Sequence, residues 1–306
     1  MHKNLKLTIG IPAYNEESNI VNILKSILKQ KEKGFEIEKI LVISDGSTDG
    51  TVSIVKSIKD KRITVFDNSK RVGKSELLNV LFRKSTSEIL VLFDADVVMK
   101  SANILEYLIR PFINDKNVGL TGGNPVPIPG KTFVERSINS SFVPYKELQV
   151  KFKGGNNVYG CQGSILALSK KLYKKIQIPP KMIGNDSYIY YSCLINGFKF
   201  VHVHEAVVWY RSPSNISDHL KQNKRFLAAQ YRLKRVFGDI VEREHHVPPV
   251  LLYRLLAIQF IKMPIHSAFI FFVNKAINNR AKSDEKKMTA IWDVAVSTKE
   301  AVRNVK

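Results

Sequence analysis

The sequence predicts an α/β fold in which helices flank a mostly parallel, doubly wound sheet. Short apolar runs alternate with helical patterns through the first 117 residues. Polar clusters follow the first, second and fourth of these runs, where ligands of such sheets bind. A length of 306 residues, 44% of them hydrophobic and 25% charged, suits one large domain with a small addition, or two modest domains.

The first half contains four expected strands and four expected helices. The strands are expected at residues 7–11, 39–43, 63–66 and 89–93, and the helices at 18–30, 51–59, 74–84 and 101–113. Ile20, Ile23, Leu24 and Ile27 recur at three- and four-residue spacing, which indicates one apolar helix face.

The second half continues this alternation less regularly. Strands are expected at residues 118–126, 158–168, 199–204 and 206–210, with helices at 131–153, 169–175, 187–195 and 216–237. Asn185 or Asp186 near its start and Gly197 past its end bound the helix at 187–195.

The chain is strongly basic. Its 48 Lys and Arg against 27 acidic residues give a formal net charge of +21, which favours anionic partners: nucleic acid, a phospholipid surface or phosphorylated substrates. The two cysteines, Cys161 and Cys193, have no metal-ligand spacing and indicate a reducing compartment such as the cytoplasm. The first residues contain no apolar core of a secretory signal.

Residues 250–273 are strongly apolar, but Arg254, Lys262 and His266 interrupt them and Pro264 breaks them. A spanning helix needs about 20 apolar residues with few charges. The pattern favours two shorter helices at a membrane interface, whose Lys and Arg reach the headgroups. Packing against the rest of the protein or an oligomer partner, and a true span, are the alternatives. From residue 278 onward we expect a charged, frayed helix.

Two carboxylates end the fourth strand. Asp94 and Asp96 are two residues apart, so they share one face if the chain stays extended. Such a pair is a hard oxygen site for Mg²⁺ or Mn²⁺, which in turn can hold phosphates. The alternative is an ordinary acidic turn.

Asp45 ends the second strand. Ser47 or Thr48 with Asp49 could cap the next helix. Asp45 is not needed for this cap, so the cap does not explain Asp45 itself. A carboxylate at this edge can accept hydrogen bonds from a nucleobase or ribose.

Residues 71–75 resemble the end of a phosphate loop, but Asn68 stands where the first glycine is needed, so a P-loop ATPase is excluded. Arg71 and Lys74, beside a glycine that opens a helix, can still face a nucleotide diphosphate.

Two further patterns lie in the second half. Asp186 stands where a helix begins and is either an N-cap or a general base. Gln222 and Arg225 are three apart and share a helix face, and the planar donor fork of Arg suits a diphosphate. A solvated basic face is the alternative for Arg225.

Five motifs, taken in order, resemble glycosyltransferase family 2 over about residues 5–240. They are the segment 12–16, Asp45-Gly46-Ser47, Asp94-Ala95-Asp96, Asn185-Asp186 and Gln222-x-x-Arg225-Phe226. This resemblance implies a GT-A fold, Rossmann-like, and inverting transfer from a nucleotide-diphosphate sugar, usually a UDP-sugar. It implies a GT-A domain at 1–240, with a nucleotide-binding half at 1–117 and an acceptor-binding half at 118–240. A helical, membrane-associated region at 241–306 would follow.

The resemblance also implies residue roles. Asp186 matches the catalytic base. Asp96 matches the ligand of Mn²⁺ or Mg²⁺, and His204 is a further candidate ligand, against the alternative of an ordinary strand histidine. Gly163, Asn185 and Phe226 fall on the acceptor side. The nucleotide-binding positions are Pro12, Ala13, Tyr14, Glu16, Asp45, Lys74, Asp94, Ala95, Gln222 and Arg225.

Two departures from the family pattern stand out. Asn185 replaces a usual Glu, and Phe226 replaces a usual Trp, which keeps an aromatic wall without the indole donor. Processive synthases usually carry several long spanning helices, and no such set is evident. We therefore expect a single transfer to a hydroxyl or phosphate of a lipid-linked or membrane-proximal glycan acceptor, at the cytoplasmic face of an anionic membrane. A processive polysaccharide synthase is the alternative.

Two other classes compete. A nucleotidyltransferase would place a glycine-rich phosphate loop where residues 12–16 stand. A nucleic-acid-binding protein would show basic residues interleaved with exposed aromatics and no acidic cleft, so nucleic acid is not an expected partner. The sequence leaves the sugar, the acceptor and the oligomeric state open.

Overall fold

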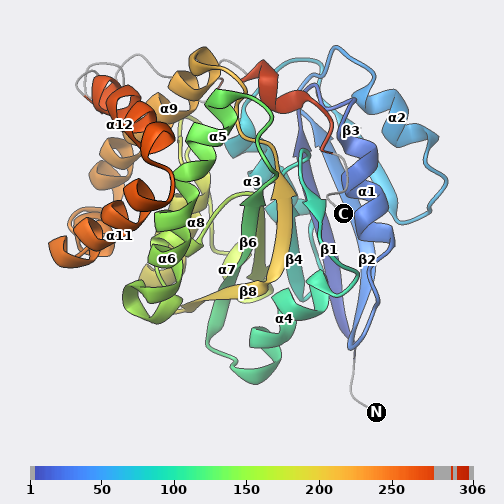
Figure 1. Cartoon of the computed structure of the whole chain (residues 1–306). Coiled ribbons are helices and arrows are strands. Elements are labelled where there is room, and N and C mark those ends of the chain that lie inside the picture. Colours follow the sequence, from blue (N-terminus) through green and yellow to red (C-terminus); the bar gives the residue numbers. More distant parts are fainter. Residues whose placement is uncertain (1–3, 279–290, 292–294, 303–306) are drawn as a thin grey trace.

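The computed structural model describes residues 4–278, 291 and 295–302, and these form one mixed sheet with helices on both faces (Figure 1). The strand order is β3-β2-β1-β4-β7-β6-β8-β5. The strands are β1 (Leu5–Ala13), β2 (Phe35–Ser44), β3 (Ile63–Asp67), β4 (Ile89–Phe93), β5 (Val98–Met99), β6 (Val118–Pro127), β7 (Ile165–Ser169) and β8 (Lys199–Tyr210).

The helices of the first half lie between successive strands. They are α1 (Ile20–Leu28), α2 (Thr51–Ser57), α3 (Lys74–Lys84) and α4 (Ile104–Asn114). The later helices are α5 (Phe133–Ser140), α6 (Phe142–Lys151), α7 (Lys170–Tyr173), α8 (Asn185–Ile195), α9 (Ile216–Phe237), α10 (Ile240–His245), α11 (Pro249–Lys262) and α12 (Pro264–Asn278). Short 3₁₀ turns are η1 (Phe152–Gly155), η2 (Val158–Gly160) and η3 (Val296–Lys299).

The sheet confirms the predicted α/β class, with one antiparallel strand, β7, inserted at its centre and another, β5, at its edge. Strands β3, β2, β1 and β4 pair in parallel. Strand β7 runs antiparallel to both β4 and β6, and β6 pairs in parallel with β8. Two parallel groups therefore meet at β7, and their carboxyl ends lie at the same edge of the sheet.

The central strands are buried on both faces, as parallel strands covered by helices must be. In β4, Ile89, Val91 and Phe93 belong to the core on one face, while Leu90 and Leu92 belong to the core on the other. The alternation follows from the two-residue period of a strand. The first core packs against α1 and α4, and the second against α3, α7, α8 and α9.

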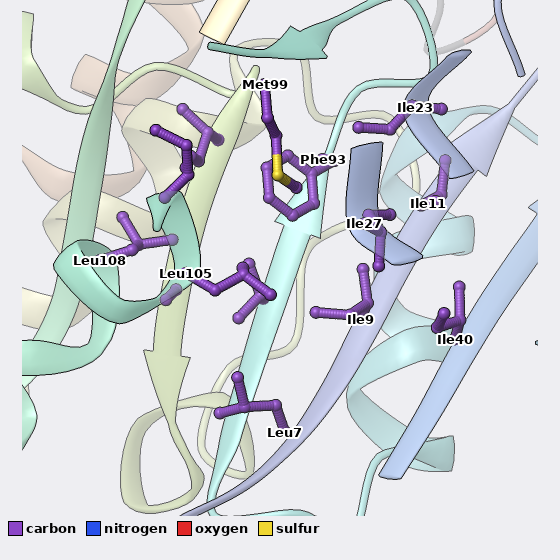
Figure 2. Close-up of a cluster of buried hydrophobic side chains, with 14 of the residues drawn as sticks. Leu7, Ile9, Ile11, Ile23, Ile27, Ile40, Phe93, Met99, Leu105 and Leu108 are labelled. Carbon is purple, nitrogen blue, oxygen red and sulfur yellow. The ribbon is translucent and has the colours of Figure 1, made fainter. Parts of the chain in front are cut away.

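Figure 2 shows the first of these cores. Ile9 of β1 and Phe93 of β4 lie among Ile27 of α1 and Leu105 and Leu108 of α4. All five side chains are at most 1% exposed. This packing holds the ends of β1 and β4 in fixed positions, and those ends carry the polar clusters noted in the sequence.

Residues 131–153 form two helices rather than the single predicted one. Helix α5 ends at Ser140 and α6 begins at Phe142, so that Pro144 lies in the first turn of α6. Proline has no N–H to donate to the residue four positions earlier, and its ring clashes with that carbonyl. A continuous helix through Ser140 is therefore not available.

Two predicted strand boundaries are also wrong. Residues 158–168 were expected to be one strand, but the 3₁₀ turn η2 precedes β7, which begins only at Ile165. Asn157 starts this turn by accepting the N–H of Tyr159 at 3.0 Å. Residues 199–204 and 206–210 form the single strand β8.

Helices α11 and α12 meet at Pro264, as the sequence predicted. Leu255 of α11 packs with Leu148 and Phe152, next to α6, so one face of the pair covers the domain. Val250 and Ile261, on the other face of α11, are 82% and 81% exposed. Within the described ranges, no helix combines the length and the apolar content that crossing a bilayer requires.

Much of the predicted frayed helix after residue 278 lies outside the described residues, namely 279–290, 292–294 and 303–306. The described part of it is different from the prediction. Residues 295–302 form the 3₁₀ turn η3 and adjoining extended chain, drawn red at the top of Figure 1, where they cross the carboxyl ends of the first strands.

Candidate active site

A cavity of about 720 Å³ opens at the carboxyl ends of β1, β2 and β4, a size typical of small-molecule sites. The structure brings almost every residue singled out in the sequence to this one cavity. Its lining includes Pro12, Ala13, Tyr14, Glu16, Asp45, Lys74, Asp94, Ala95, Asp96, Gly163, Asn185, Asp186, Gln222, Arg225 and Phe226. Their roles stay predictions, but their convergence from distant parts of the chain is a structural fact.

The loops after β1 and β2 are interlocked. Asn15 has a φ of 51°, a left-handed conformation that Asn tolerates, and its N–H donates to Ser47 Oγ at 3.1 Å. The N–H of Thr48 donates to Asn15 Oδ1 at 2.9 Å. Ser47 and Thr48 thus join the two loops instead of capping α2, and Asp49 accepts the N–H of Thr51 at 3.0 Å.

Asp45 organises the loop before α3. Its Oδ1 accepts the backbone N–H of Val72 at 2.7 Å and of Gly73 at 3.1 Å. Arg71 Nε lies 3.6 Å from Asp45 Oδ2, and its guanidinium carbon lies 3.9 Å from the centre of the Tyr14 ring. A buried carboxylate therefore fixes an arginine–tyrosine stack at the cavity wall.

The cavity floor carries three carboxylates and two lysines. Lys74, the first residue of α3, forms an ion pair with Asp94, and Lys299 forms one with Glu16. Asp96 lies within electrostatic range of Asp94 and of both lysines. The sequence reasoning missed Lys299, because nothing in its pattern connects it to a loop 283 residues earlier.

Burial and mutual repulsion change the acidity of these carboxyls. Burial raises the pKa of Glu16, and the negative charge of Asp96 adds to the rise, while the ion pair with Lys299 opposes it. Burial also raises the pKa of Asp96, and the charge of Asp94 acts in the same direction. Adjacent carboxylates with raised pKa values favour a compensating cation.

The donor set fits a divalent cation held jointly with a ligand. Within the part of the chain that the structure describes, no three His, Cys, Asp or Glu side chains are grouped as a metal site. Asp94 and Asp96 nevertheless offer hard oxygen atoms to the same cavity. Mg²⁺ is commonly bound through one or two carboxylates and completed by substrate phosphates, so these residues fit such a cation when phosphate is present.

Asp186 lies in the first turn of α8 and is not its N-cap. The N-cap is Gly184, with a φ of 74°, and no side chain caps the helix. The carboxylate of Asp186 instead accepts the N–H of Gly163 at 3.2 Å and of Ser187 at 2.8 Å. The neighbouring Asn185 is held by Ser75, whose hydroxyl donates to Asn185 Oδ1 at 2.9 Å.

One short segment connects Asp186 to Asp94, the residue that follows β4. Gly163 donates to Asp186, and the carbonyl of the next residue, Ser164, accepts the N–H of Asp94 at 3.3 Å. The antiparallel pairing of β7 with β4 produces this contact, because it returns residues 163–164 to the end of β4.

Helix α9 forms a basic wall. Gln222, Arg225 and Phe226 line the cavity, and Arg225 lies 5.4 Å from the Phe226 ring centre. Burial lowers the pKa of Arg225, while the negative charges of Asp186, Asp94 and Asp96 oppose this. Arg225 therefore faces the acidic side chains from both halves of the cavity.

Aromatic residues line the cavity beside α6, and the sequence reasoning missed two of them, Phe142 and Tyr145. Phe142, Tyr145 and Tyr159 border the cavity there. The hydroxyl of Tyr145 donates to the carbonyl of Tyr159 at 3.0 Å, and burial raises the pKa of Tyr145. An α-helical pattern alone does not distinguish such residues from core residues.

The structure does not bring His204 to the cavity, which favours the alternative of an ordinary strand histidine over a metal ligand. Its ring lies 5.0 Å from that of His202 on β8, and its carbonyl accepts a hydrogen bond from Asn124 at 3.0 Å. His204 is absent from the cavity lining. His204 lies too far from the carboxyl end of β8, at Tyr210, which is the end that reaches the cavity.

Comparison with known sequences agrees with this geometry. The model of the family described as Glycosyl transferase family 2 matches residues 8–177. Poly-beta-1,6-N-acetyl-D-glucosamine synthase of Staphylococcus aureus (strain COL) is 25% identical over 227 residues, covering 72% of this chain and 53% of its own. Probable glycosyltransferase YdaM of Bacillus subtilis (strain 168) is 25% identical over 253 residues, covering 75% and 59%. The chain thus spans between half and three fifths of the length of these relatives.

Solved structures share the fold. A mannosyltransferase from Pyrobaculum calidifontis, in complex with GDP-Man and Mn²⁺, has a TM-score of 0.59 and 18% identity, covering 96% of this chain and 78% of its own. Glucosyl-3-phosphoglycerate synthase from Mycobacterium tuberculosis, with Mn²⁺, UDP and phosphoglyceric acid, has a TM-score of 0.55 and 16% identity, covering 74% and 78%. These similarities identify the architecture as GT-A.

Proposed function

The chain belongs to glycosyltransferase family 2, and we propose that it transfers a sugar from a nucleotide-diphosphate sugar, a UDP-sugar in particular, to a hydroxyl or phosphate of a lipid-linked or membrane-proximal glycan acceptor. The chain is a glycosyltransferase by family membership, which argues against the nucleotidyltransferase and nucleic-acid-binding alternatives. We assign the donor side to the half formed by residues 1–117 and the acceptor side to 118–240.

One observation carries the proposal. A single cavity holds the carboxylates Asp94 and Asp96 on the donor side and a further carboxylate, Asp186, on an element that begins after β7. The N–H of Gly163 donates to the Asp186 carboxylate and the carbonyl of Ser164 accepts the N–H of Asp94, so residues 163 and 164 connect the two sides. A donor diphosphate and an acceptor hydroxyl need such adjoining sites.

The proposed donor site uses charge and stacking. Asp45 accepts hydrogen bonds from the base and fixes Arg71 against Tyr14, while Lys74 and Arg225 face the diphosphate. Asp94 and Asp96 would hold Mn²⁺ or Mg²⁺, which when bound supplies positive charge to the diphosphate. Arg225 and Lys74 add to the stabilisation of charge on the departing nucleoside diphosphate.

Asp186 is the proposed general base. Its two hydrogen bonds with backbone N–H groups orient the carboxylate, and each oxygen keeps a lone pair. The acceptor oxygen loses its proton to Asp186 as it attacks the anomeric carbon on the face opposite the diphosphate. The bond to the diphosphate breaks as the new bond forms, so the anomeric centre inverts and no covalent enzyme intermediate forms.

Helices α11 and α12 support the proposed acceptor class. Their exposed side chains include Tyr253, Ile265 and Phe272, at 71%, 72% and 67%, together with the exposed basic residues Arg254 and Lys262. Apolar side chains flanked by Lys and Arg suit the boundary of an anionic bilayer. These side chains support association with the cytoplasmic side of a membrane, beside a lipid-linked acceptor.

A processive polysaccharide synthase is the second candidate, and a specific observation favours it. The relative from Staphylococcus aureus is named as a synthase of poly-beta-1,6-N-acetyl-D-glucosamine, and this chain covers only 53% of it. Product length separates the two candidates, because a single transfer adds one sugar and a synthase yields a ladder of products.

The direct test is a release assay. Purified protein with Mn²⁺ or Mg²⁺ is offered a panel of UDP- and GDP-sugars together with lipid-linked and soluble glycan acceptors, and nucleoside diphosphate is measured. Release that depends on one donor, one acceptor and the cation supports the proposal. Absence of acceptor-dependent release across the panel contradicts it.

A further inference from the structure

Residues 295–302, here called the C-terminal strap, are anchored at two separate places. At one end, the N–H of Ser297 donates to Asp218 of α9 at 2.9 Å. At the other, the N–H of Val302 donates to Asn19 Oδ1 at 3.0 Å, and Asn19 Nδ2 donates to the Lys299 carbonyl at 3.0 Å. The strap thus connects α9 to the start of α1 over the top of the sheet (Figure 1).

The strap is also packed through its side chains. Val302 is 1% exposed and lies with Val98 and Ile128. Ser297 accepts the N–H of Ser214 at 3.1 Å. These contacts fix the backbone on both sides of Lys299, so the direction of that side chain is determined by the fold.

Lys299 enters the proposed donor site. Its ammonium forms an ion pair with Glu16 and donates to the carbonyl of Tyr14 at 3.1 Å. Glu16 is 5% exposed, and the side chain of Lys299 is 24% exposed. Lys299, Glu16 and Tyr14 all line the same cavity as Asp96.

The charges give Lys299 a definite task. The negative charge of Asp96 acts against a charged Glu16, and Lys299 acts on both carboxylates with the opposite sign. Lys74 is paired with Asp94 instead. Lys299 therefore provides the compensating positive charge for the Glu16 side of this carboxylate group.

We infer that Lys299, delivered by the C-terminal strap, is a further donor-site residue, which weakens binding of a divalent cation alone and strengthens binding of the nucleoside diphosphate. This inference rests on the proposed donor site at Asp94 and Asp96. One positive charge acts on the two ligands in opposite directions. A residue that only supports the fold would change both affinities in the same direction.

The test compares Lys299→Met with Lys299→Arg, which keeps the charge, and with Lys199→Met, which removes an exposed lysine paired with Asp115 outside the cavity. Mn²⁺ binding without nucleotide is measured by electron paramagnetic resonance, and binding of UDP and GDP by calorimetry. In Lys299→Met, Mn²⁺ should bind tighter and the nucleotide weaker, each by roughly threefold to tenfold, the effect of one charge at this range. Lys299→Arg should change both affinities less than Lys299→Met does, and Lys199→Met should resemble the unaltered protein.

A double variant tests whether Lys299 acts on Mn²⁺ affinity through its pairing with Glu16. In a Glu16→Gln background, Lys299→Met should raise Mn²⁺ affinity by less than it does alone, because one of the two carboxylates is already neutral. Equal weakening of both ligands, or no change in either, overturns the inference while leaving the donor site intact. If the unaltered protein binds neither Mn²⁺ nor UDP nor GDP, the donor site itself fails and the inference with it.

Discussion

The carboxylate of Asp186 accepts the backbone N–H of Gly163 at 3.2 Å, which ties the first turn of α8 to the loop before β7. The second oxygen accepts the N–H of Ser187 at 2.8 Å. Neither bond caps the helix, whose N-cap is Gly184. The orientation of Asp186 toward the cavity is therefore set by its contact with the loop before β7, and this suits a proton acceptor.

The first prediction concerns this residue. Asp186→Asn should lower kcat by about 10²–10⁴-fold, the usual contribution of a general base, because the amide cannot take the acceptor proton. Nucleotide-sugar binding should be largely kept. Steady-state kinetics and calorimetry measure the two effects, with Asp115→Asn as a control for the same change outside the cavity. Equal losses of binding and turnover would assign Asp186 a structural role.

The second prediction concerns Asp96. Asp96→Asn should abolish the part of nucleotide binding that depends on Mn²⁺, because a hard anionic ligand is lost. Binding measured in a chelator should change little. Calorimetric titration of UDP with Mn²⁺ and with chelator separates the two. A Mn²⁺-dependent gain as large as that of the unaltered protein would contradict the assignment.

The third prediction concerns Asp45. Asp45→Ala should lower the free energy of unfolding by about 1–3 kcal/mol, because the N–H groups of Val72 and Gly73 lose their acceptor. Asp45→Asn keeps an acceptor oxygen and should lose less. Urea denaturation gives both values. Identical losses in the two variants would show that the hydrogen bonds do not stabilise this loop.

The fourth prediction concerns pH. Burial lowers the pKa of His202 to about 4, whereas an unfolded histidine titrates near 6.5. The unfolded chain therefore takes up this proton first, and stability from His202 is complete above the unfolded pKa and lost as pH falls toward the folded one. Between about pH 7.5 and about pH 5 the loss reaches about 2 kcal/mol.

His202→Gln, which keeps a donor for the Gly123 carbonyl, tests this in urea denaturation at several pH values. The variant should lose less stability on acidification than the unaltered protein. Burial lowers the pKa of His219 and His245 as well, so part of the pH dependence should persist. An unchanged pH slope in the variant would rule out His202 as its source.

The fifth prediction concerns α11 and α12. Replacing Ile261 and Phe272 by Ser should reduce co-sedimentation with anionic liposomes, because both side chains are exposed on the outer face. Turnover of a soluble acceptor should be kept. Ile195→Ser changes an isoleucine that is 61% exposed on α8, away from this face, and serves as the control. Equal liposome binding by all variants would contradict a membrane contact here.

Local patterns predicted much of the fold and most of the cavity. The apolar residues 89–93 are enough to predict a buried strand whose side chains alternate between the two faces. A proline such as Pro264 interrupts a helix at its own position, so that boundary could also be predicted. The carboxyl ends of parallel strands meet at one edge, so Asp45 and Asp94 could be placed together without coordinates.

Long-range pairing was not predictable in the same way. The antiparallel direction of β7 depends on which strands it joins, and the sequence of β7 does not state this. His204 lies on a strand, as predicted. Its distance from the cavity could be judged only once the structure showed that β8 ends at Tyr210. No sequence pattern connects the segment around Lys299 with the loop that contains Glu16, so their ion pair could not be predicted.

The inserted strand β7 has a consequence for how the enzyme family can vary. Phe93 pairs with Ile165, and the residues just beyond this pair are Asp94 and Ser164. Sliding β7 by one residue would move its loop about 3.3 Å and turn each side chain to the other face. A shift in this register would therefore move residues 163 and 164 relative to Asp94, so we expect insertions to be tolerated in loops beside the cavity but not within residues 161–169.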